Sequence, residues 1–118
     1  MTHKDIVSQF LKMIMAGDIQ QAFDQFVDGW FVHHNQYTKP WKDELIAWMQ
    51  WNHGVFPDKT FVVDMLVEED DRVVTYSLLK FTPDHKGIRV VHIFRFEEDK
   101  IAEMRDVAME LREDAPNA

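Results

Sequence analysis

Residues 88–111 constrain the fold of this chain more than any other segment. They read IRVVHIFRFEEDKIAEMRDVAMEL, which is two strand-like runs separated by a polar turn at residues 98–100. Each run carries one ionisable side chain among apolar neighbours, His92 in the first and Asp106 in the second. Burying such a group is costly unless it is paired or its pKa shifts. The segment therefore predicts both a β-hairpin and a candidate site.

The spacing of this hairpin predicts which side chains face each other. A turn centred near Asp99 places residue 92 opposite 106, 94 opposite 104, and 96 opposite 102. Directly opposed residues in an antiparallel pair have Cβ atoms about 5 Å apart. Side chains two positions apart share a face, so His92, Asp106, Phe94 and Met104 are expected on the inner face. The side chains that alternate with them, Arg95, Glu103 and Arg105, are expected on the outer face, where Arg95 and Glu103 can pair.

The rest of the chain divides by periodicity. At 118 residues it has the length of one domain, which we place at residues 1–113 with a flexible tail at 114–118. Apolar residues at helical spacing predict a helix between a Thr2 cap and Gly17, a second from Asp18 to Gly29 and a third from Pro40 to Gly54. An extended stretch at residues 30–40 separates the last two. Four strands follow, at residues 61–70, 72–82, 88–97 and 101–112. This order predicts an α+β fold, with three N-terminal helices packed on one face of a strongly curved, mainly antiparallel sheet.

Composition excludes several classes of function. The chain has no cysteine, which rules out disulfides, thiolate metal sites and a cysteine nucleophile. Its net charge of −8 argues against binding to nucleic acid. We see neither an apolar N-terminal leader nor an apolar run long enough to span a membrane, and we expect a cytoplasmic protein. Nine Phe and four Trp provide bulky apolar side chains for a lined pocket or a subunit interface.

Three segments resemble the SnoaL-like branch of polyketide cyclases in the NTF2-like superfamily. They are FVHHN at residues 31–35, VHIFRF at 91–96 and KIAEMRDV at 100–107, and the resemblance extends over nearly the whole chain. It implies a cone-shaped, cystatin-like roll with a pocket open at one end, and a homodimer formed through the outer face of the sheet. It also implies that no cofactor or metal is needed, and that Asp106 is the acid/base for an intramolecular aldol closure.

The pair of Asp106 and His92 supports more than one chemistry. In an apolar pocket either group could move a proton to or from a carbon next to a carbonyl, as aldol-type cyclases, isomerases and dehydratases require. We therefore expect an enzyme acting on an apolar carbonyl compound, with Asp106 and His92 as catalytic residues. A buried structural ion pair is the alternative reading of the same residues. At the level of function, the alternatives are a non-catalytic binder of an apolar small molecule and a dimerisation module without a cavity.

Other side chains are expected to line the pocket. His33 and His34 alternate along an extended segment, so only one of them can point inward, and the resemblance favours His34 with Asn35 beside it. Tyr76 could donate a hydrogen bond to a carbonyl, and aromatic side chains around the third helix suggest a flat ligand, although Trp48 is expected in the core. A metal site formed by His34, His53 and His92 lacks the spacing of a known motif. The residues expected to bind substrate are His34, Asn35, Trp41, Tyr76, Phe94 and Met104.

Overall fold

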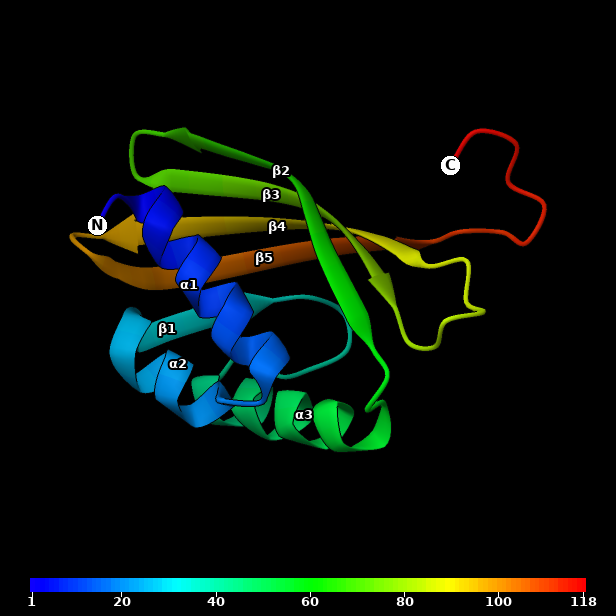
Figure 1. Ribbon diagram of the computed structural model, residues 1–118. Coiled ribbons are helices and arrows are strands. Elements are labelled where there is room, and N and C mark those ends of the chain that lie inside the picture. The colour runs from blue at the N-terminus through cyan, green and yellow to red at the C-terminus, as the bar shows by residue number, and fades with distance from the viewer.

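A computed structural model describes all residues from 1 to 118 and contains three helices and one five-stranded sheet. The helices are α1 (His3–Ala16), α2 (Ile19–Phe26) and α3 (Lys42–Val55). The strands are β1 (Val27–His34), β2 (Thr60–Glu69), β3 (Arg72–Lys80), β4 (Ile88–Glu97) and β5 (Lys100–Glu110). The helices pack on one side of a curved sheet, with α1 running diagonally across it (Figure 1). The α+β class expected from the sequence is confirmed. No helix is both long and apolar enough to cross a membrane.

The two ends of α1 have the signals expected of them. The Thr2 hydroxyl accepts a hydrogen bond from the backbone N–H of Asp5 at 3.1 Å, and the Asp5 carboxylate accepts one from the Thr2 N–H at 2.9 Å. This reciprocal pair satisfies two otherwise unpaired donors at the start of the helix. Gly17 ends α1 in the left-handed region, with φ of 90°. A Cβ at Gly17 would lie 2.7 Å from His53 Nε2, so the glycine also allows α1 and α3 to approach closely.

The sheet has the order β1-β5-β4-β3-β2. Strands β2 to β5 form the predicted antiparallel meander, whereas β1 pairs in parallel with β5 at one edge and makes the sheet mixed. The sequence predicted a second helix up to Gly29 and only an extended stretch after it. In the structure α2 ends at Phe26 and the strand begins at once. The pairing partner of β1 lies about seventy residues further along the chain, so local periodicity does not reveal it.

The register of the last hairpin is largely the one expected. His92 lies opposite Asp106 and Phe94 opposite Met104. Near the turn the prediction was wrong by one residue, because Phe96 pairs with Ile101 rather than with residue 102. A bulge causes this shift, since Arg95 pairs with Glu103 and Ala102 is left as the extra residue. The bulge lies beyond the paired site residues and leaves them facing the same side.

The core lies between the helices and the inner face of the sheet. Phe10 of α1 packs edge to face against Phe23 of α2, with ring centroids 5.3 Å apart, and against Phe94 of β4 at 6.2 Å. Phe94 is fully buried in this core and does not line the cavity described below, which corrects its assignment as a substrate-binding residue. Trp48 was expected in the core but is 41% exposed, because it lies on the face of α3 that borders the cavity described below.

Candidate functional site

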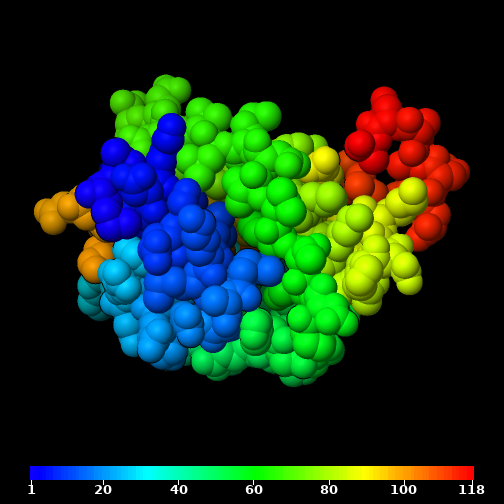
Figure 2. Space-filling view, viewed as in Figure 1, coloured from blue at the N-terminus to red at the C-terminus, as the bar shows by residue number.

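A cavity of about 410 Å³ lies between α1, α3 and the inner face of β4 and β5. In Figure 2, α1 (blue) lies across the front of the molecule and α3 (green) along its lower side, and the yellow to red residues of the later strands are visible mainly at the left and right edges. Fifteen of the 21 lining residues are hydrophobic, so the cavity suits a mainly apolar ligand. The six polar residues that line it are Asn35, Asn52, Lys59, His92, Asp106 and Glu110.

Asp106 of β5 is held at the cavity wall by His33 of β1. The His33 Nε2 atom lies 2.8 Å from Asp106 Oδ2, and the His33 side chain is fully buried. Because an ionised carboxylate can only accept, Nε2 carries the proton and donates it. The other ring nitrogen, Nδ1, lies 3.3 Å from Thr38 Oγ1. The Asp106 side chain keeps 17% of its surface exposed, which leaves the carboxylate accessible from the cavity.

The loop after β1 is folded around Asn35. The side-chain oxygen of Asn35 accepts hydrogen bonds from the backbone N–H groups of Tyr37 at 2.8 Å and Thr38 at 3.0 Å. Its amide nitrogen lies 3.5 Å from Asp106 Oδ2, a long contact. Asn35 lines the cavity, as expected, and so does Tyr37. The loop therefore places the Asn35 amide beside Asp106 and the Tyr37 ring on the cavity wall.

His92 faces the cavity from β4, next to Asp106. Its ring lies 6.0 Å from that of Phe61 and 5.8 Å from that of Phe94. The Nδ1 atom is buried and has no hydrogen-bond partner. Burial lowers the pKa of His92 to about 4, against the opposing attraction of the Asp106 carboxylate. His92 is therefore neutral at pH 7, and the group hydrogen-bonded to Asp106 is His33 instead.

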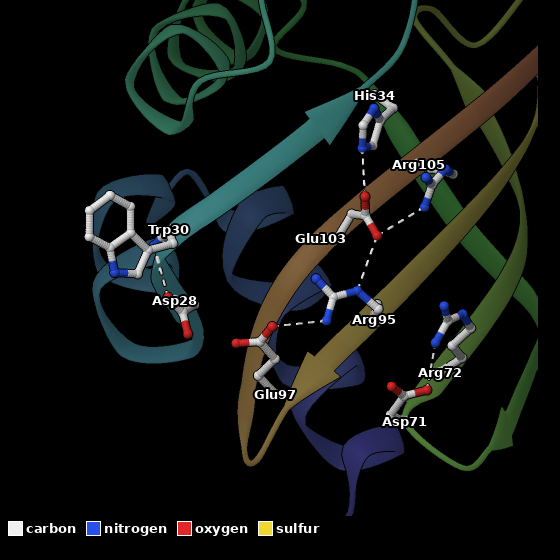
Figure 3. A network of polar contacts seen from close by, with 9 residues as sticks. All are labelled: Asp28, Trp30, His34, Asp71, Arg72, Arg95, Glu97, Glu103 and Arg105. Carbon is white, nitrogen blue, oxygen red and sulfur yellow. Dashed lines mark hydrogen bonds and ion pairs between the residues drawn. The ribbon is translucent and has the colours of Figure 1, made fainter.

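His34 lies on the opposite face of the sheet, so the expectation that it points inward was wrong. Its Nε2 donates to Glu103 Oε2 at 2.7 Å (Figure 3). Glu103 also accepts from Arg95 at 3.1 Å, as predicted, and pairs with Arg105 at 3.0 Å. Burial would raise the pKa of Glu103, but the hydrogen bonds from these three side chains outweigh it and lower the pKa to about 2. This outer-face network ties β1 and β4 to β5.

Two more of the residues expected to bind substrate lie outside the cavity. Tyr76 alternates along β3 with the buried Thr75 and Ser77, and so it points to the outer face, where the Arg89 guanidinium lies 4.9 Å from its ring centroid. Trp41 precedes α3, is 60% exposed and does not line the cavity. Met104 does line the cavity and is buried, as expected.

Four polar residues of the site were not recognised from the sequence: His33, Asn52, Lys59 and Glu110. Strand alternation had identified His33 and His34 as the two candidates for the inward-facing histidine, and only the register of β1 with β5 decides between them. Asn52, Lys59 and Glu110 line the cavity, although none of them belongs to a motif that would have indicated this. His34, His53 and His92 are not brought together, and no three acidic or histidine side chains form a metal-binding group.

Comparison with known proteins identifies the family of the chain. Residues 7–104 match the family model of the SnoaL-like domain. The chain belongs to the SnoaL-like domain family. No protein of curated function matches this SnoaL-like protein in sequence.

Solved structures share the fold of this SnoaL-like protein at low sequence identity. IdmH of Streptomyces antibioticus, a candidate polyketide cyclase, is 16% identical, with a TM-score of 0.75 over 92% of both chains. An NTF2-like protein of Cytophaga hutchinsonii is 14% identical, with a TM-score of 0.76 over 92% of this chain and 91% of its own. A cystatin-fold protein of Novosphingobium aromaticivorans is 12% identical, with a TM-score of 0.78 over 91% of this chain and 98% of its own. These neighbours support the cystatin-like, NTF2-like fold.

Proposed function

We propose that this SnoaL-like protein binds an apolar carbonyl compound in its cavity and catalyses an acid/base reaction on it. The reaction class is aldol-type cyclisation, isomerisation or dehydration, each of which begins with removal of a proton from a carbon next to a carbonyl. One observation carries the proposal: a fully buried imidazole holds the Asp106 carboxylate, at 2.8 Å, on the wall of a largely apolar cavity. Such a carboxylate is a positioned general base.

Each polar group has a proposed role in this chemistry. Asp106 takes the proton from carbon, and His33 is a positioning residue that orients the carboxylate without touching the substrate. His92 is neutral at pH 7, since burial lowers its pKa to about 4, and its ring N–H can donate to the carbonyl oxygen as negative charge develops there. A neutral donor on one side of the ligand and an anionic base beside it are what enolate formation requires.

Proton exchange on a simple ketone tests the proposal without knowledge of the natural substrate. β-Tetralone, a bicyclic apolar ketone with acidic α-protons, is incubated with the protein in deuterium oxide, and loss of the α-proton signal is followed by NMR. We expect the wild-type protein to accelerate this exchange, and Asp106→Asn to slow it by about 10²–10⁴-fold. Binding of the ketone to the variant, measured by calorimetry, should be nearly unchanged. Asp99→Asn, in the exposed turn of the same hairpin, is the matched control and should exchange like the wild type.

A non-catalytic binder is the second candidate function, and the apolar lining of the cavity favours it, since fifteen of 21 residues there are hydrophobic. The same experiment separates the two candidates. Binding of the ketone without accelerated exchange would support the binder and reject Asp106 as a base. The reading of the chain as a dimerisation module whose cone is only core predicted no cavity, and the cavity of about 410 Å³ contradicts it.

We also propose a homodimer that forms through the outer face of the sheet. Several large apolar side chains on β2, β3 and β5 are exposed to a third or more, and an apolar patch of this kind favours association. They are Val62, Met65, Val67, Val74, Tyr76, Val107 and Met109.

A further inference from the structure

The cavity contains one lysine, Lys59, which is half-buried just before β2. Its Nζ donates to the side-chain oxygen of Asn52 at 2.5 Å. None of the ion pairs in the chain includes Lys59, although Asp106 and Glu110 line the same cavity. The ammonium group therefore has one neutral partner and no counter-ion.

Asn52 contributes a second donor at the same place. It is only 4% exposed and lines the cavity from α3. A lysine ammonium can only donate, so the side-chain oxygen of Asn52 must face Lys59, and its NH₂ group points the other way. That nitrogen makes no hydrogen bond within the chain and is not among its buried unpaired atoms, so it keeps exposed surface from which it can donate to a ligand in the cavity. The side-chain oxygen is taken by Lys59.

The surroundings of Lys59 favour an anion. Burial lowers the pKa of Lys59, because a charged group loses hydration in an apolar cavity. A bound anionic oxygen would offset that loss and use the free donors of both side chains. Asp106 and Glu110 would repel the same anionic group, which directs it to the part of the cavity lined by Lys59.

We propose that Lys59 and Asn52 bind an acidic oxygen group of the ligand, so that the preferred ligand is an apolar compound carrying a carboxylate. The inference rests on the proposed function, since it assigns a ligand class to the same cavity. The ligand is then bound with a fixed polarity: its carboxylate lies at Lys59, and its reacting carbon lies at Asp106. Lys59 and Asp106 then act separately, Lys59 on affinity and Asp106 on turnover.

A matched pair of probes tests this assignment. β-Naphthoate and β-naphthamide have nearly the same shape and differ in charge, and their dissociation constants are measured by calorimetry at pH 7. We expect the wild-type protein to prefer the carboxylate by about tenfold or more, as hydrogen bonds between charged groups imply. Lys59→Met should remove the preference and Lys59→Arg should keep most of it. Lys86→Met, which removes a lysine from an exposed loop, should behave like the wild type.

A second variant covers the case in which Lys59→Met does not fold. Asn52→Asp keeps the shape of the side chain and supplies Lys59 with an internal carboxylate, so it should also abolish the preference. An unchanged preference in either folded variant would overturn the inference, as would equal affinities of the wild-type protein for the two probes.

The result for β-tetralone separates this inference from the proposed function. If the ketone binds but naphthoate is not preferred over naphthamide, the assignment of Lys59 fails and the proposed function stands. If none of the three compounds binds, the cavity is not the ligand site, and both are overturned. If naphthoate is preferred but α-proton exchange is not accelerated, the ligand class holds and the catalytic role of Asp106 fails.

Discussion

The imidazole of His33 and the carboxylate of Asp106 lie 2.8 Å apart although they are 73 positions apart in the sequence. They meet because β1 pairs in parallel with β5, with His33 opposite Met104 and His34 opposite Arg105. The parallel register directs His33 to the inner face, and the next residue, His34, to the outer one. The two neighbouring histidines therefore serve different faces of the sheet, one at the cavity and one in the network around Glu103.

Replacing His33 should affect both stability and exchange. His33→Leu leaves Asp106 without its hydrogen-bond donor and should lower the free energy of unfolding by about 1–3 kcal/mol. His33→Gln, whose side-chain amide can reach a similar point, should recover part of this loss. Chemical denaturation measures the stability of each variant, and α-proton exchange of β-tetralone measures the effect on the proposed chemistry. Equal stability and equal exchange rates in the two variants would show that the contact with Asp106 contributes little.

His92 should make the protein less stable in mild acid. Its pKa is lowered by burial from the ordinary 6.5 to about 4, so between these pH values the unfolded chain binds a proton that the folded protein does not. Stability must then fall as the pH drops from 6.5 to 4, and linkage puts the total on the order of 3 kcal/mol. His92→Leu removes this group. The difference in stability between the variant and the wild type, measured by urea titration, should therefore shift in favour of the variant as the pH falls from 6.5 to 4. A difference that does not change with pH would reject the shifted pKa.

Glu103 should stabilise the protein in a different pH range. The pKa of this carboxyl is lowered from its ordinary value of 4.5 to about 2, so its contribution is complete above 4.5 and is lost as the pH falls through 2. Because the network is partly exposed, we expect Glu103→Gln to cost only about 1–2 kcal/mol at pH 7, with much less lost near pH 2. Glu113 forms no ion pair, so Glu113→Gln is the control and should show no such dependence. A loss of the same size at both pH values would point to packing instead of charge.

The proposed homodimer can be tested on the outer face of the sheet. Val67 and Val74 lie opposite each other on β2 and β3 and are 52% and 37% exposed. If this face is the interface, light scattering should show a dimer for the wild-type protein and a monomer for the double variant with lysine at both positions, because like charges would meet across it. Gln21→Lys on α2 adds a charge away from the sheet and should leave the dimer intact. A wild-type monomer at micromolar concentration would reject the proposal.

The parts of the fold that were predicted correctly are those set by local pattern. Thr2 and Asp5 cap a helix because they are three residues apart, and the register of His92 with Asp106 follows from the length of one turn. The errors lie where distant segments meet. Whether His33 or His34 faces inward depends on how β1 is aligned with β5, and the alternation of a single strand does not contain that information.

The same limit applies to Trp48, Tyr76 and Lys59. Helical spacing put Trp48 on the apolar face of α3, but that face borders an open cavity, so the ring remains partly exposed. Tyr76 was assigned to the pocket from its chemistry, whereas the pleat of β3 directs it outward. Lys59 lies in no recognisable pattern, because its role depends on the cavity that α3 and the sheet form together.

The pairing of β1 with β5 has a consequence for inactivation. Strand β1 lies at the edge of the sheet, and its pairing with β5 is interrupted between Val27 and Val32. An edge element with an interrupted ladder can open locally at a lower free energy than the rest of the molecule. Opening would withdraw His33 and leave the carboxylate of Asp106 unsupported while the meander stays folded. Low concentrations of denaturant should therefore abolish the proposed activity before any global unfolding transition is detected, and removing the denaturant should restore the activity.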